Sequence, residues 1–270
     1  MTLVTHLSIF RTILSIAVLV VVALVQSGCS TTPMPAAAKS EPAQVSAAAQ
    51  TKPTRSPLRI ALIQDKSLST GETRTPQLKV EDLDPLLELL GLMGGELAVG
   101  IIHDRSNLAF ARLRIDAGPE EPAAVVESDN PFERRDQRAA QRKLKEKFEE
   151  REQSWREDMQ TRIGEFQGAV DPMLSMAADA NHSPVWDAVK RADLFLSESD
   201  SDGNTEPRRY AVLITDGIDD VGARPVPINS RTRILVVNGA GQLGALAVLK
   251  PQRFESIAAA VRYIVGLETK

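Results

Sequence analysis

The chain has 270 residues, a formal net charge of −4 and a single cysteine, and 43% of its residues are hydrophobic. This is the composition of an ordinary globular protein, and the weak negative charge excludes a basic protein that binds nucleic-acid phosphates. Because of this charge, we expect no nucleic-acid partner. The single cysteine excludes both an intrachain disulfide framework and a cysteine-rich zinc site.

The first 28 residues are expected to be a signal peptide of the lipoprotein type. An apolar run covers residues 12–25, which is shorter than the ~20-residue helix that spans a bilayer and has the length of a signal-peptide core. Ser27 and Gly28 precede Cys29, and together they resemble the lipobox of bacterial lipoproteins, in which the cysteine is lipidated. The resemblance implies a lipid anchor at Cys29, and Ser30 after it favours the outer membrane. The alternative is an uncleaved signal anchor, which also places the head on a membrane, at its periplasmic or extracytoplasmic face.

The segment that follows Cys29, up to Pro57, is expected to be a flexible tether. It is rich in Ala, Pro, Ser, Thr and Gln and contains no aromatic residue. Such a segment cannot bury enough apolar surface to offset the entropy lost on ordering. A folded head is therefore expected over residues 58–270.

In the head, apolar runs alternate with helical patterns. The expected helices start at Asp84-Pro85 and Ser183-Pro184, and a third covers residues 252–267. This order predicts an α/β fold, a doubly wound and mostly parallel sheet with helices on both faces. The expected strands are residues 59–64, 96–102, 210–215, 234–238 and 245–249, with a half-wet edge strand at 108–115.

Residues 131–167 predict a long, highly charged helical insertion. Strong helix formers run without proline or glycine from residue 132 to Gly164. A helix of about 35 residues would be ~50 Å long, so it must protrude, lie across the surface or pair with a partner. One interpretation is a solvated helix with i,i+4 ion pairs, and the other is a coiled-coil or docking arm. The thin apolar stripe on one side consists of Leu144, Phe148, Trp155, Met159, Ile163 and Phe166.

Oxygen-bearing side chains follow two of the predicted strands. Asp65, Ser67 and Ser69 form a D-x-S-x-S pattern after the first strand, and Asp216-Gly217 follows a later one. Ser183 stands at the start of a helix between them. The carboxyl ends of parallel strands are where open α/β sheets bind ligands, and an all-oxygen set with few carboxylates favours Mg²⁺ or another hard divalent cation.

These pieces, in this order, resemble the metal ion-dependent adhesion site (MIDAS) of von Willebrand factor type A (vWA) domains. The resemblance covers the whole head and implies a metal held by Asp65, Ser67, Ser69, Ser183 and Asp216. It also implies a protein partner that offers a carboxylate to the metal, and no catalysis. Serine stands at 183 where the family has threonine, and the helical insertion makes the stretch before Ser183 longer than usual.

Two other functions fit parts of the sequence. A scaffold lipoprotein would act through the long charged helix, with a vestigial metal site. A Mg²⁺-dependent phosphohydrolase would use Asp65 as nucleophile, but Ser67 stands where that chemistry needs a second aspartate. His182 is expected to be a surface histidine, and Asp219 and Asp220 a solvated turn.

A glycine-rich stretch after the strand at 234–238 has the glycine spacing of a dinucleotide site. Gly239, Gly241 and Gly244 spell G-x-G-x-x-G, but a strand rather than a helix is expected to follow. We therefore expect these glycines to be a tight connection between strands.

Overall fold

The computed structural model describes residues 56–104, 110–124, 128–198, 206–222, 224–238 and 242–269. The chain divides after Gln50 into two units, and all the described residues belong to the second. The predicted signal peptide, Cys29 and the tether up to residue 55 therefore lie outside the described residues. Among the described helices, none is both long enough and apolar enough to cross a membrane.

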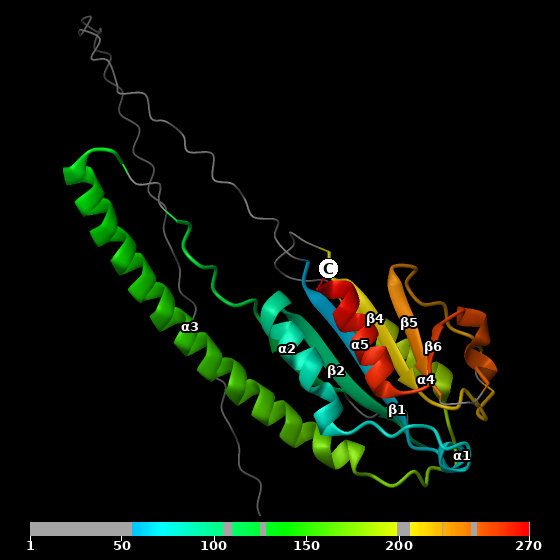
Figure 1. Cartoon of the computed structure of the whole chain (residues 1–270). Helices are drawn as coiled ribbons and strands as arrows, with labels where there is room; N and C mark the ends of the chain where they lie inside the picture. Colours follow the sequence, from blue (N-terminus) through cyan, green and yellow to red (C-terminus); the bar gives the residue numbers. More distant parts are fainter. Residues whose placement is uncertain are drawn as a thin grey trace, which may run out of the picture. The chain divides into compact units, whose positions relative to one another are not determined.

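A six-stranded sheet forms the centre of the fold, in the order β3-β2-β1-β4-β5-β6 (Figure 1). All neighbouring pairs are parallel except β2 with β3, which is antiparallel. The expected mixed α/β fold with a mostly parallel sheet is thus confirmed. The strands are β1 (Leu58–Asp65), β2 (Gly95–Ile102), β3 (Ala111–Ile115), β4 (Arg208–Ile214), β5 (Thr232–Val237) and β6 (Gln252–Phe254).

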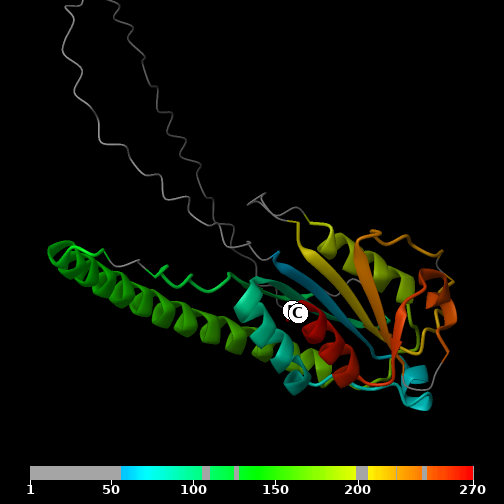
Figure 2. The ribbon, with the colours of Figure 1, turned by 45° about the horizontal axis from the view of Figure 1, so that its top comes forward.

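Helices pack against both faces of the sheet because the central strands are apolar on both sides. Leu58, Ile60 and Leu62 of β1 belong to one apolar cluster, and Ala61 and Ile63 belong to the other. Figure 2 shows α4 on the opposite face from α5. The first cluster is shared with α2 (Asp84–Met93), α3 (Pro131–Leu174) and α5 (Ile257–Glu268), and the second with α4 (Val185–Leu196).

Most of the elements expected from the sequence are present. The strands expected at 59–64, 96–102, 210–215 and 234–238 match β1, β2, β4 and β5 within two residues, and β3 is the expected edge strand. On β3, Arg112 and Arg114 alternate with the buried Leu113 and Ile115, as expected for a strand with one solvent-exposed face. The helices expected after Asp84-Pro85 and Ser183-Pro184 are α2 and α4.

The expectation for the C-terminal region was wrong in two places. Residues 245–249 lie in a 3₁₀ helix, η2 (Gly244–Leu249), and not in a strand. Leu246 is fully buried in that helix but Val248 is 59% exposed, so the apolar run packs on one side only. The sixth strand is instead the polar Gln252–Phe254, and α5 begins after it, where Ser256 Oγ accepts a hydrogen bond from the N–H of Ala259.

The long charged helix is α3, which continues past the expected end at Gln167 to Leu174. Its C-terminal half packs on the domain: Phe166, Val170 and Leu174 are buried in the first cluster, and Trp155 packs against it. Packing at i,i+4 spacing therefore carries the helix through Gly168 and Pro172.

The N-terminal half of α3 extends beyond the sheet and is accompanied by the segment that leaves β3 (Figures 1 and 2). Trp155 joins α3 to the start of that segment, because its Nε1 donates a 3.0 Å hydrogen bond to the carbonyl of Asp116. Near the far end, the N–H of Ser128 donates to Oε1 of Gln137 at 2.9 Å. We call residues 131–151 of α3 the arm. The sequence allowed a helix that protrudes, lies across the surface or pairs with a partner. The C-terminal half of α3 lies across the domain, and the arm protrudes.

Candidate metal centre

Asp65 is the last residue of β1 and is fully buried at the carboxyl edge of the sheet. Its Oδ2 accepts hydrogen bonds from Ser183 Oγ at 2.8 Å and from Thr215 Oγ1 at 2.7 Å. Its Oδ1 accepts one from the N–H of Ser67 at 2.9 Å. Groups that precede α4, follow β4 and follow β1 thus meet at one carboxylate.

The two serines of the D-x-S-x-S pattern lie next to each other at the start of a short helix, α1 (Leu68–Glu72). Their hydroxyl oxygens are 3.1 Å apart. The loop is held because Ser67 forms a β-bridge with Ala180 and accepts a 2.7 Å bond at its carbonyl from Thr70 Oγ1. The structure therefore brings together four of the predicted ligands, Asp65, Ser67, Ser69 and Ser183.

Asp216 reaches the same edge through a less direct contact. It follows β4, and its Oδ1 accepts a 3.0 Å bond from the N–H of Ile218. Its Oδ2 is 3.5 Å from Thr73 Oγ1, and the same hydroxyl donates to the carbonyl of Ser69 at 2.9 Å. Thr73 thus joins Asp216 to the serine loop.

Gly217 gives the turn after Asp216 its shape. Its φ is +78°, and a Cβ there would lie 2.3 Å from the carbonyl oxygen of Leu243. Only glycine accommodates both this backbone conformation and this close approach. Gly244 also has a positive φ and lies against Gly217. The expected role of these glycines was a tight connection between two strands, but the described part of the stretch leads into the 3₁₀ helix η2. Gly239 and Gly241 lie outside the described residues.

Asp220 is exposed, as the expected solvated turn requires, and Asp219 is half-buried, and both side chains accept hydrogen bonds near the start of α4. Asp220 Oδ1 accepts a 2.7 Å hydrogen bond from the N–H of Ser183, which lowers the pKa of Asp220 together with a weaker contribution from His182. Asp219 Oδ1 accepts from the N–H of Trp186 at 3.4 Å. Asp219 therefore meets an N–H group of the first turn of α4, where unpaired N–H groups favour negative charge. Asp220 instead holds the N–H of Ser183, two residues before the helix begins. The His182 side chain is exposed, as expected, and lies 3.3 Å from Asp220.

Thr215 and Thr73 are parts of the site that the residue pattern did not single out. Thr215 directly precedes Asp216 and Gly217, so the three residues form a T-D-G sequence. Its hydroxyl both donates to Asp65 and accepts from the N–H of Gly217 at 3.0 Å. The T-D-G sequence therefore carries a signal for Thr215 as well as for Asp216. Thr73 had no local signal, because its contact with Asp216 spans 143 residues.

The pKa of Asp65 is governed by its burial and by its hydrogen bonds. Burial raises the pKa of Asp65, and the hydrogen bonds from Thr215, Ser67 and Ser183 oppose that rise. The adjacent Lys66 does not neutralise it: the Lys66 Nζ donates to the carbonyl of Leu174 at 2.6 Å and to Gln77 Oε1 at 3.0 Å. The ion pairs formed within the described part of the chain involve neither Asp65 nor Asp216.

The donor set consists of two carboxylates and three hydroxyls. Asp65, Ser67, Ser183 and Asp216 are each at most 4% exposed. No group of three or more His, Cys, Asp or Glu side chains is arranged to hold a metal ion within the described ranges. The five oxygen-bearing residues suit a hard cation with a partly open coordination shell better than a soft transition metal.

Comparisons with known proteins give little further guidance. No protein-family model matches the chain, and no curated protein matches it. Among solved structures, the pilus adhesin SpaC from Lactobacillus rhamnosus GG, in an open conformation, aligns with 79% of this chain at 9% identity and a TM-score of 0.39. The alignment spans 30% of the adhesin's length.

Proposed function

We propose that the head is a vWA-like, doubly wound module that binds a protein partner through a Mg²⁺-dependent adhesion-type site. The observation that carries the proposal is the meeting of Asp65, Ser67, Ser69 and Ser183 at one buried edge, with Asp216 joined to them through Thr73. Mg²⁺ bound there would present an open position to a carboxylate of the partner. The chain would act as a binding protein and not as an enzyme.

The proposal includes attachment to a membrane. A lipidated Cys29 and the tether up to Pro57 would hold the head at the extracytoplasmic face, in the periplasm if the anchor lies in the outer membrane. This part rests on the sequence alone, on the apolar run at 12–25 and the small residues before Cys29. Labelling of cells with a radioactive fatty acid would test it, because label in the wild type but not in Cys29→Ser is the expected result.

The metal site is tested by titrating MgCl₂ into the purified full chain in detergent and following its melting temperature. A ligand at 100 times its Kd stabilises a protein by about 2.7 kcal/mol, which is a measurable shift. The shift should vanish in Asp65→Ala and persist in Asp136→Ala, which removes an exposed carboxylate from the arm. A wild type that does not respond to Mg²⁺, Mn²⁺ or Ca²⁺ would end the metal proposal.

The second candidate is the scaffold that acts through the long helix, and the protrusion of the arm favours it. Crosslinking in cells distinguishes the two. Capture of a partner should be lost with EDTA or in Asp65→Ala if the metal site binds it. It should be lost on removal of residues 119–151 if the arm binds it; this deletion spares Trp155 and the packed half of α3.

A further inference from the structure

The two halves of α3 carry opposite charge. Residues 132–147 contain seven basic and three acidic side chains, a formal charge of +4, and residues 149–171 contain three basic and seven acidic ones, a charge of −4. We call these the basic segment and the acidic segment. All these charged residues are exposed except Arg134 and Glu152, which are half-buried.

The stability of the helix itself does not account for this segregation. The helix dipole favours acidic residues near the N-terminus and basic residues near the C-terminus, and α3 has the opposite order. The ion pairs within the helix, such as Lys145 with Glu149 at 3.7 Å and Arg162 with Asp158 at 2.9 Å, are exposed and contribute little. The charge pattern therefore suggests a partner outside the helix.

One side of α3 is available to such a partner along both segments. At 100° per residue, six of its charged residues fall within about 120° of one another, on the side opposite the stripe that contains Trp155 and Phe166. The stripe packs on the domain, so the charged side faces away from it. The six residues are Arg135, Lys143 and Lys147 of the basic segment and Glu150, Glu157 and Glu165 of the acidic segment.

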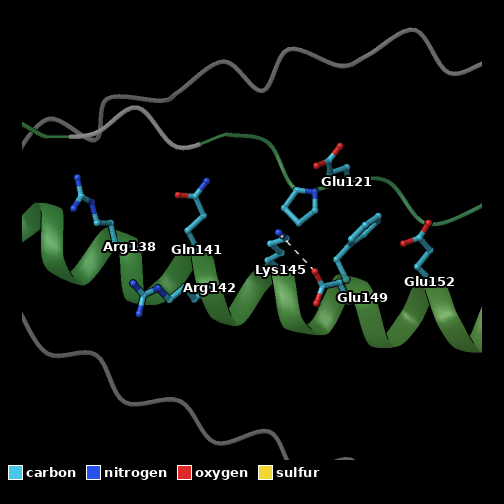
Figure 3. A pocket seen from close by; sticks show the side chains of 9 residues that line it. Glu121, Arg138, Gln141, Arg142, Lys145, Glu149 and Glu152 are labelled. Carbon is cyan, nitrogen blue, oxygen red and sulfur yellow. Dashed lines mark ion pairs between the residues drawn. The ribbon is translucent and has the colours of Figure 1, made fainter.

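A different side of the arm faces the segment that leaves β3. There a hollow of about 390 Å³ is lined by Pro122 and Phe148 together with charged side chains, among them Lys145 and Glu149 (Figure 3). The Lys145–Glu149 ion pair is drawn as a dashed line in that figure. Because the accompanying segment lies on this side, it does not cover the charged side.

We infer that two copies of this chain pair through their α3 helices in antiparallel orientation, with the basic segment of each against the acidic segment of the other. A twofold axis near Phe148 makes this contact self-complementary, which is the commonest geometry of homodimers. Parallel pairing would oppose like charges and is disfavoured. The inference does not depend on the metal site.

The same alignment gives the exposed aromatic residue of the arm a place to pack. Phe132 is 81% exposed, and an axis near Phe148 places it opposite the partner's residues 164–168. Gly164 and Gly168 of that stretch have no atom within 4 Å of the position that a Cβ would take. The absence of side chains there leaves room for an aromatic ring.

The test uses the full chain in density-matched detergent micelles and measures its mass by sedimentation. The wild type should dimerise reversibly at low salt and dissociate at about 1 M NaCl, where the Debye length falls to about 3 Å. Two charge-reversal variants carry the test. One is Arg135→Glu/Lys143→Glu/Lys147→Glu and the other is Glu150→Lys/Glu157→Lys/Glu165→Lys.

Each variant alone should dimerise at least tenfold more weakly, because like charges then face each other. An equimolar mixture of the two should regain the dimer, since opposite charges meet again. Circular dichroism confirms that each remains helical. The matched control, Lys190→Glu/Lys250→Glu/Arg262→Glu, reverses three exposed charges elsewhere and should leave the dimer intact.

A chain that is monomeric at all concentrations at low salt would overturn the inference, and so would a dimer that the reversals leave unchanged. A monomer that binds vesicles with anionic lipid, but not neutral vesicles, would overturn it in favour of a lipid surface as the partner of the basic segment.

Discussion

The hydroxyl of Ser183 donates a 2.8 Å hydrogen bond to Oδ2 of Asp65 across 118 residues of sequence. Two features hold the two residues in place. Asp65 is fixed as the last residue of β1 in the parallel sheet, and Ser183 is fixed because its N–H donates a hydrogen bond to the carboxylate of Asp220. Ser183 and Asp65 thus meet although the insertion that contains α3 lies between them in the sequence.

We expect Asp65→Asn to stabilise the metal-free protein and to abolish its response to Mg²⁺. Burial raises the pKa of Asp65 above the ordinary value of 3.8, so an ionised Asp65 at neutral pH destabilises the fold. Asparagine removes the charge with little change of shape. Melting curves in EDTA and in Mg²⁺ check both effects. A lower melting temperature of Asp65→Asn in EDTA would contradict the first, and a retained Mg²⁺ shift the second.

Ser183→Ala should weaken Mg²⁺ binding about tenfold or more, whereas Ser183→Thr should retain it. The alanine variant loses the only side-chain oxygen that this residue offers, and groups that ligate or orient ligands typically contribute 10- to 100-fold to metal affinity. Threonine keeps the hydroxyl. Calorimetric titration measures both affinities, and equal binding by all three proteins would show that residue 183 is not a ligand.

Trp155→Ala should lower the free energy of unfolding by about 2–3 kcal/mol, since it removes a half-buried aromatic ring and a hydrogen bond to the carbonyl of Asp116. Leu144→Ala is the matched control. Leu144 lies on the same stripe but is 49% exposed, so its loss should cost about 0.5 kcal/mol or less. Urea denaturation compares them. If both variants lost equal stability, the C-terminal half of α3 would not be the part that anchors the helix.

Glu206→Gln should lower the melting temperature at pH 7, and the difference from the wild type should shrink as the pH falls. Arg231 and Arg209 hydrogen-bond the Glu206 carboxylate and lower its pKa from 4.5 to about 2. A lowered pKa in the folded state stabilises the protein above pH 4.5, and this contribution disappears as the pH approaches 2. Melting curves at several pH values measure the difference. A difference that is constant with pH would contradict the assignment.

The sequence predicted the central strands well because buried parallel strands read as short apolar runs. It predicted β6 wrongly for the same reason: the run at 245–249 is apolar but packs as a 3₁₀ helix, whereas Gln252 and Arg253 of β6 are polar edge residues. An apolar run without periodicity does not separate these cases.

The candidate site was predictable as far as its residue types carried a local pattern. The D-x-S-x-S and T-D-G sequences led to Asp65, Ser67, Ser69 and Asp216, which lie together in the fold. The residues that hold these side chains in place were not predictable from a sequence pattern. Asp220 resembled a turn residue, and only the start of α4, 37 residues away in sequence, gives its carboxylate a partner.

The direction of β1 has a consequence for access to the site. The strand begins at Leu58 and ends at Asp65, so these two residues lie at opposite ends of the strands of the sheet, roughly 25 Å apart at 3.3 Å per residue. Glu268, near the end of α5, contacts Arg208 and Tyr210 at the start of β4, on the same side as Leu58. Both ends of the folded head therefore lie at the pole opposite the site. A surface, a fusion partner or an affinity tag attached at either end therefore leaves the pole that carries Asp65, the candidate metal site, uncovered.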